Sequence, residues 1–192
     1  MCSRQRLVLG YCAQRFSGIR RWQVSAYSSL RCSASMKPTV IATIVCLIAA
    51  VSEALVTGSD PRSRFRRLRL PSYSPAFRIW ILIGLFYYVM CFVILRHLLA
   101  AADFSGLHRS ALVLVIAMLG ANAAWNALFF RLSALRLSFL AFLPYGMLAV
   151  ALTVLMIPIY AFGGVLLSAY CGYLVYAACW SYRLWQLNDP KH

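Results

Sequence analysis

The chain has 192 residues, of which 62% are hydrophobic and 12% are charged, with a formal net charge of +15. Soluble domains are about 45–50% apolar and about one quarter charged, so this composition excludes an ordinary soluble protein and indicates a membrane protein. The basic residues are concentrated in the N-terminal tail and between the apolar segments, where positive charge orients a membrane protein, so nucleic-acid binding is not expected.

Residues 1–37 form a basic, serine-rich tail with seven basic residues, seven serines and no acidic residue. This composition is typical of an organelle targeting segment, and a retained disordered tail is the alternative. A mitochondrial and a plastid envelope fit it equally well. The tail lacks the apolar core of about 7–15 residues that a secretory signal peptide needs.

Five apolar segments follow, at about 39–57, 77–99, 110–130, 137–158 and 160–184. Each is close to the length of about 20 residues that crosses a bilayer, and a backbone at that depth must satisfy its own hydrogen bonds. The sequence therefore predicts an all-α integral membrane protein, a five-transmembrane-helix bundle over residues 38–188. Pro144 is expected to bend the fourth helix, and a turn centred on Pro158 to separate the last two.

Glu53 is the only acidic residue inside a predicted span. An acid within the membrane is a functional candidate by default. The alternative is that Glu53, about one turn from the end of its span, reaches the lipid headgroups.

The loop "SDPRSRFRRLRLPSYSP" (59–75) contains five arginines, and Ser59 or Asp60 before Pro61 predicts a short interfacial helix. The arginines are expected to contact anionic headgroups, at about 1 kcal/mol each, or only to set the topology. The candidates for lipid or anion contact are Arg64, Arg66, Arg67 and Arg69. Because positive charge favours the cytosolic side, this loop and the C-terminus are predicted to be cytosolic.

The third segment carries Asn122 and Trp125 on one helical stripe with Met118 and Phe129. An amide facing lipid is costly, so Asn122 is expected to face the bundle, either in an interhelical hydrogen bond or against a ligand. Trp125 lies too deep for the interfacial aromatic belt, and is either a pocket wall or a packing residue.

The fifth segment carries two patterns. Gly164, Ser168 and Gly172, spaced by four, predict close helix packing. Beside them, Tyr173, Ala177, Trp180 and Ser181 suggest a face that lines a cavity. The seven cysteines contain no CxxC pair, so neither a zinc site nor a disulfide framework is predicted.

Three motifs occur in order along the chain: "PSYSP" (71–75), N-x-x-W-x-x-L-F-F (122–130) and "AACWSYRLWQLN" (177–188). Together they resemble the TspO/MBR family of tryptophan-rich sensory proteins and mitochondrial translocator proteins, over about residues 38–188. The resemblance implies a five-helix bundle, often a homodimer, around a pocket for tetrapyrroles, sterols or synthetic aromatic ligands. It also implies that the first loop is a lid over that pocket. The positions that match the family pattern are Pro71, Pro75, Asn122, Trp125, Ala177, Tyr182, Trp185 and Asn188.

The chain also departs from the family pattern. A family tryptophan on the second helix is Gly84 here, although Trp80 lies one turn earlier, and a tryptophan on the fifth is Tyr173. Other family residues are replaced at Met118, Ala127, Ala169 and Ser181. Because the proposed light-dependent porphyrin breakdown of some bacterial members depends on the two missing tryptophans, the chain is not expected to be an enzyme.

The leading hypothesis is a membrane protein that binds a porphyrin-like tetrapyrrole or a sterol and transports or regulates it, with no required cofactor. The predicted ligand-binding residues are Trp80, Asn122, Trp125, Phe129, Tyr173, Ala177, Trp180 and Ser181. The alternatives are a scaffold with a degenerate pocket and, less favoured, a porphyrin-degrading enzyme. The expected partners are the bilayer, the ligand and a second copy of the chain, in a mitochondrial or plastid envelope.

Overall fold

A computed structural model describes residues 37–58, 60–101 and 106–189 of the chain. The contacts divide the chain into two units, Met1–Val40 and Ile41–His192, and the packing described below is that within the second unit. The targeting-segment prediction for the tail falls on residues 1–36, outside the described residues.

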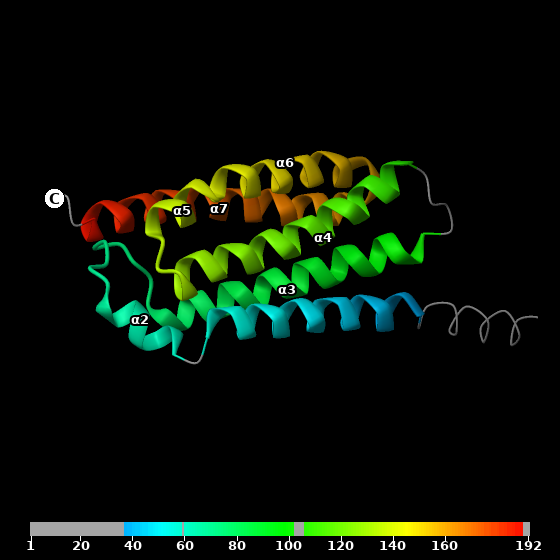
Figure 1. Cartoon of the computed structure of the whole chain (residues 1–192). Helices are drawn as coiled ribbons and strands as arrows, with labels where there is room; N and C mark the ends of the chain where they lie inside the picture. The colour runs from blue at the N-terminus through cyan, green and yellow to red at the C-terminus, as the bar shows by residue number, and fades with distance from the viewer. Residues whose placement is uncertain (1–36, 59, 102–105, 190–192) are drawn as a thin grey trace, which may run out of the picture. The chain divides into compact units, whose positions relative to one another are not determined.

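Five helices in the described part of the chain are long and apolar enough to span a membrane (Figure 1). This confirms the predicted all-α, five-span fold, with helix ends within a few residues of those expected. The first span is Lys37–Thr57. The later helices are α2 (Pro61–Arg67), α3 (Phe77–Ala100), α4 (Gly106–Asn126), the π-helical segment η1 (Ala127–Arg131), α5 (Leu135–Leu140), α6 (Phe142–Ile159) and α7 (Ala161–Asn188).

The fourth span is broken at Ala141, between α5 and α6. Pro144 explains the position of the break, because proline has no N–H for the carbonyl of Leu140 and its ring disfavours that turn of helix. The predicted turn at Pro158 was misplaced by two residues. Pro158 lies inside the last turn of α6, and the chain reverses at Tyr160, whose φ of −155° and ψ of 89° are not helical.

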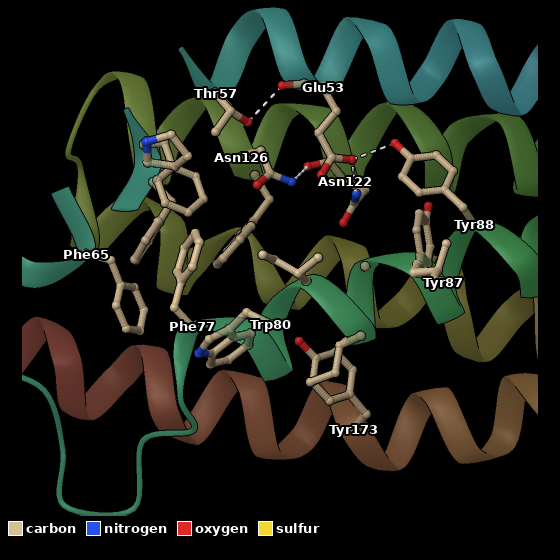
Figure 2. Close-up of a pocket in the computed structure, with 18 of the residues that line it drawn as sticks. Glu53, Thr57, Phe65, Phe77, Trp80, Tyr87, Tyr88, Asn122, Asn126 and Tyr173 are labelled. Carbon is tan, nitrogen blue, oxygen red and sulfur yellow. Dashed lines mark hydrogen bonds between the residues drawn. The ribbon is translucent and has the colours of Figure 1, made fainter. Parts of the chain in front are cut away.

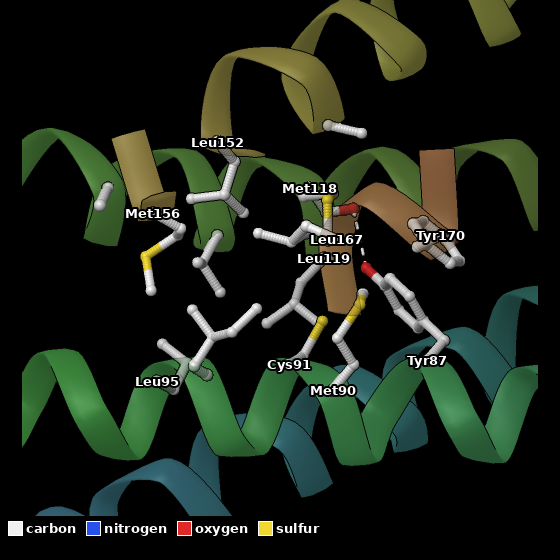
Figure 3. Close-up of a cluster of buried hydrophobic side chains, with 14 of the residues drawn as sticks. Tyr87, Met90, Cys91, Leu95, Met118, Leu119, Leu152, Met156, Leu167 and Tyr170 are labelled. Carbon is white, nitrogen blue, oxygen red and sulfur yellow. Dashed lines mark hydrogen bonds between the residues drawn. The ribbon is translucent and has the colours of Figure 1, made fainter. Parts of the chain in front are cut away.

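The solid core of the bundle lies between α3, α4, α6 and α7 (Figure 3). Most of its side chains are aliphatic or sulfur-containing, such as Cys91, Leu95, Met118, Leu152 and Leu167, and three are tyrosines, at positions 87, 145 and 170. Large apolar side chains on the outer faces are more than half exposed, as expected for surfaces that meet lipid; examples are Ile81, Val113, Val154 and Val175.

Gly164 marks the closest approach between α6 and α7, since a Cβ there would lie 3.2 Å from the Cα of Ile157. The other members of the predicted packing ladder make no such contact. Gly172 has nothing within 4 Å of a Cβ position, and Ser168 is exposed and donates its hydroxyl to the Gly164 carbonyl of its own helix. Within this chain the ladder therefore reduces to one close contact, because Ser168 and Gly172 lie on an exposed face of α7.

Candidate ligand-binding pocket

A cavity of about 440 Å³ lies at the end of the bundle next to α2 (Figure 2). Its walls come from the first span, α2, α3, α4, η1 and α7, so segments far apart in the sequence contribute to one site. Most of the lining is aromatic: Phe65, Phe77, Trp80, Tyr87, Tyr88, Trp125, Phe129, Phe130, Tyr170, Tyr173 and Trp180. A cavity of this size and apolarity is typical of a site for a small hydrophobic molecule.

The rings of the third and fifth spans meet at this cavity. Phe129 and Trp180 have ring centroids 5.9 Å apart, and Trp80 of α3 lies 4.6 Å from Trp180. Tyr173 packs edge-on to Trp80 at 6.4 Å. The Trp180 indole is almost fully buried, and its Nε1 donates to Ser74 Oγ at 3.0 Å, which fixes the "PSYSP" loop against α7.

Asn122 both joins helices and lines the cavity. Its Nδ2 donates to Glu53 Oε2 at 2.6 Å, and Tyr88 OH donates to the same oxygen at 2.6 Å. Tyr145 OH contacts Asn122 Oδ1 at 3.5 Å and shares a 2.7 Å hydrogen bond with Tyr170 OH. The polar side chains thus form one chain of hydrogen bonds across the bundle, in which Glu53 points inward rather than toward headgroups.

Trp125 likewise has both of the roles that the sequence allowed. Its ring stacks on Phe129 at 5.1 Å and lines the cavity, while its Nε1 donates to the Ser138 carbonyl at 3.1 Å. Two residues later α4 widens into η1, where Leu132 N–H donates to the Ala127 carbonyl. Such π segments are frequent at functional sites, and this one carries two of the lining phenylalanines.

Six of the eight predicted ligand-binding residues line this cavity: Trp80, Asn122, Trp125, Phe129, Tyr173 and Trp180. Ala177 lines a smaller adjoining void of about 40 Å³. Ser181 is fully buried and lies outside both linings. Sequence reasoning did not include Phe65, Tyr88 or Gly84 among the lining residues. A lone phenylalanine in the arginine run "RSRFRRLR" was the signal available for Phe65.

The short helix α2 covers the end of the cavity. Asp60 caps it by accepting the Ser63 backbone N–H at 3.0 Å, and hydrogen bonds from Ser63 hold the pKa of this exposed carboxyl below its usual value. Phe65 is the one buried residue of α2, and it stacks on Trp180 at 6.1 Å with its plane tilted by 13°. Phe65 is therefore the residue that anchors α2 in the aromatic cluster.

The arginines of the first loop lie outside the aromatic cavity. Arg64 donates to the Arg131 carbonyl at 3.1 Å, and Arg66 and Arg69 are exposed. Arg64, Arg67 and Arg131 line a second, polar cavity of about 470 Å³. Thr57 lines both cavities, so the basic cavity adjoins the aromatic one.

Asn188 ties the chain after α2 to the end of α7. Its Oδ1 accepts the Arg69 backbone N–H at 2.9 Å, and its Nδ2 donates to the Arg69 carbonyl at 3.0 Å. Substitution of Asn188 by leucine removes both bonds at nearly constant volume, with an expected loss of about 1 kcal/mol for each. Amide hydrogen exchange over residues 65–70 should then become at least about tenfold faster.

Gln186→Leu is the matched control, because among the described residues the Gln186 amide bonds only to Tyr182 and Arg183 of the same helix. Equal exchange rates over residues 65–70 in the two variants would show that Asn188 does not hold the loop.

The fold and the cavity define a class: a five-span membrane protein with an internal, aromatic-walled pocket beneath a short basic helix. The sequence model of the TspO/MBR family matches residues 42–186, which include parts or all of every span. The chain belongs to the TspO/MBR family, whose members are generally non-enzymatic binding or transport proteins. No curated protein gives a match to this chain.

Proposed function

We propose that this protein binds a flat, hydrophobic small molecule, such as a tetrapyrrole or a sterol, inside the bundle and regulates its passage or level in an organelle membrane. The aromatic cavity of about 440 Å³ is the observation that carries the proposal. Rings from α3, α4 and α7 present faces and edges on which a planar ligand can stack.

Two further features support ligand binding. The Nε1 of Trp80 is buried without a hydrogen-bond partner among the described residues, and such donors are rare unless something else satisfies them. The adjoining basic cavity offers Arg64, Arg67 and Arg131 to acidic groups of a ligand that extends past Thr57. The arginine-rich end of the bundle is proposed to face the cytosol, in keeping with the positive-inside rule.

Quenching of tryptophan fluorescence by protoporphyrin IX tests the proposal. We expect saturable quenching in detergent micelles, and an affinity about tenfold lower in Trp125→Ala, which removes one wall of the cavity. Trp185→Ala is the control, since this ring stacks on Phe139 of α5 and does not line the cavity. Quenching that does not saturate, or equal affinities in the two variants, would contradict ligand binding here.

A further inference from the structure

Of the described residues that line the aromatic cavity, Glu53 is the only charged one. It comes from the first span, one turn before Thr57, and Figure 2 shows its carboxylate among the lining side chains, directed toward Asn122 and Tyr88. The arginines of the loop line the neighbouring cavity instead. The aromatic cavity therefore presents one negative group and no positive one among the described residues.

The hydrogen bonds of Glu53 are unevenly distributed between its two oxygens. Oε2 accepts from both Tyr88 OH and Asn122 Nδ2, at 2.6 Å each. Within residues 37–58, 60–101 and 106–189, Oε1 accepts no hydrogen bond, and no basic side chain forms an ion pair with the carboxylate. Oε1 is not among the fully buried atoms that lack a partner, so part of its surface is accessible, and Glu53 lines the cavity.

The two hydrogen bonds to Oε2 orient the Glu53 carboxylate as an acceptor without neutralising its charge. Two neutral donors fix one oxygen and the plane of the carboxylate, while the other oxygen keeps its lone pairs in a low-dielectric site. An unpaired charge there is costly, and a ligand N–H group would remove part of the cost. A protonated amine would remove most of this cost, because the aromatic rings of Trp80, Tyr88 and Trp125 line the same cavity and aromatic rings attract cations.

We propose that Glu53 is the polar anchor of this pocket and that the pocket selects hydrophobic ligands which present an N–H group, protonated amines above all, to Oε1. This inference rests on the proposed ligand-binding function and names the ligand chemistry of the same site. A bare carboxylate is rejected at Glu53, so a ligand with acidic groups must direct them to the Arg64 and Arg131 side of Thr57.

Three probes with one aromatic body test the selectivity: 1-pyrenemethylamine as the cation, 1-methylpyrene as the neutral form and 1-pyrenecarboxylate as the anion. Energy transfer from tryptophan to pyrene is measured in a zwitterionic detergent, with empty micelles as the blank. In the unmodified protein the amine should bind at least about tenfold more tightly than the neutral probe, and the carboxylate most weakly.

Glu53→Gln should abolish this preference, so that the ratio of amine to neutral affinity falls to about one. Because the glutamine oxygen can still accept from Tyr88 and Asn122, its NH₂ group would face the cavity and turn the acceptor into a donor. Tyr88→Phe removes one supporting hydrogen bond but keeps the charge, and should retain the preference.

The outcomes separate this inference from the function on which it rests. If all three probes bind saturably and with equal affinity to the unmodified protein, the pocket is still a receptor but the role of Glu53 is overturned. The same conclusion follows if the amine is preferred and Glu53→Gln leaves that preference unchanged. Loss of stability in Glu53→Gln with an unchanged affinity ratio would show a purely structural carboxylate. Failure of every probe to bind saturably would overturn both proposals.

Discussion

Substitution of Gly84 by leucine should weaken ligand binding by at least about tenfold, or about 1.4 kcal/mol, while the bundle stays folded. Gly84 lies on α3, one turn after Trp80 and one turn before Tyr88, and all three line the aromatic cavity. A Cβ at Gly84 would meet nothing within 4 Å, so a larger side chain enters open space. The new side chain occupies volume that the ligand needs.

Stability should not fall in this variant, because glycine inside a helix costs about 1 kcal/mol relative to a good helix former such as leucine. Gly120→Leu is the matched control: Gly120 lies within α4, is exposed, has nothing within 4 Å of its Cβ position and does not line the cavity. Titration with protoporphyrin IX measures both variants. Equal affinities would show that the ligand does not occupy the space beside Gly84.

Gly84 also shows what the sequence could predict about this site. The resemblance identified it as a position where the family has tryptophan, which suggested a degenerate pocket. The structure instead has an aromatic wall, because Trp80, one turn earlier on the same face, packs against Trp180 and Tyr173. Loss of one ring from a motif therefore leaves a cavity with more room beside Gly84.

The five spans could be predicted because hydropathy over about 20 residues is a local property that the bilayer imposes. The inward direction of Asn122 and Trp125 could also be predicted, since the cost of an exposed amide in lipid is independent of the neighbours. The hydrogen-bond partners of these two side chains could not be predicted from the sequence. Asn122 bonds to Glu53, 69 residues away, and only the packing of the first span against α4 brings the two together.

The structure of the loop between the first two spans was foreseen in part. The Asp60–Pro61 start of α2 follows from local capping chemistry, and the structure has it. The direction of Phe65 and the clamp between Arg69 and Asn188, 119 residues apart, depend on how the end of α7 lies beside the loop. Charge counting also assigned the loop arginines to headgroups and gave no sign that Arg64, although exposed, bonds to the Arg131 carbonyl.

Substitution of Trp180 by alanine should destabilise the folded protein more than any other single change discussed above, by about 3–5 kcal/mol. The Trp180 side chain is 1% exposed, and its ring contacts Phe65 of α2, Trp80 of α3 and Phe129 of η1. Its Nε1 also holds Ser74 of the loop. Removal of the indole leaves a void that joins the aromatic cavity, and the surrounding rings come from three different segments and cannot all close on it.

Thermal unfolding followed with a thiol-reactive dye measures this loss once the accessible thiols, among them the exposed Cys179, have been blocked in the folded protein. Cys91 is completely buried in the core and reacts only when the helices separate. Trp185→Ala is the control, because it removes the same kind of side chain five residues later on α7. The Trp185 ring is half-buried against Phe139 and Arg136, so its loss should lower the free energy of unfolding by about 1 kcal/mol. The unfolding temperature of Trp180→Ala should therefore lie well below that of Trp185→Ala. Similar unfolding temperatures in the two variants would mean that Trp180 contributes no more to stability than a half-buried ring. Other contacts would then hold α2 against the three spans that carry the aromatic cluster.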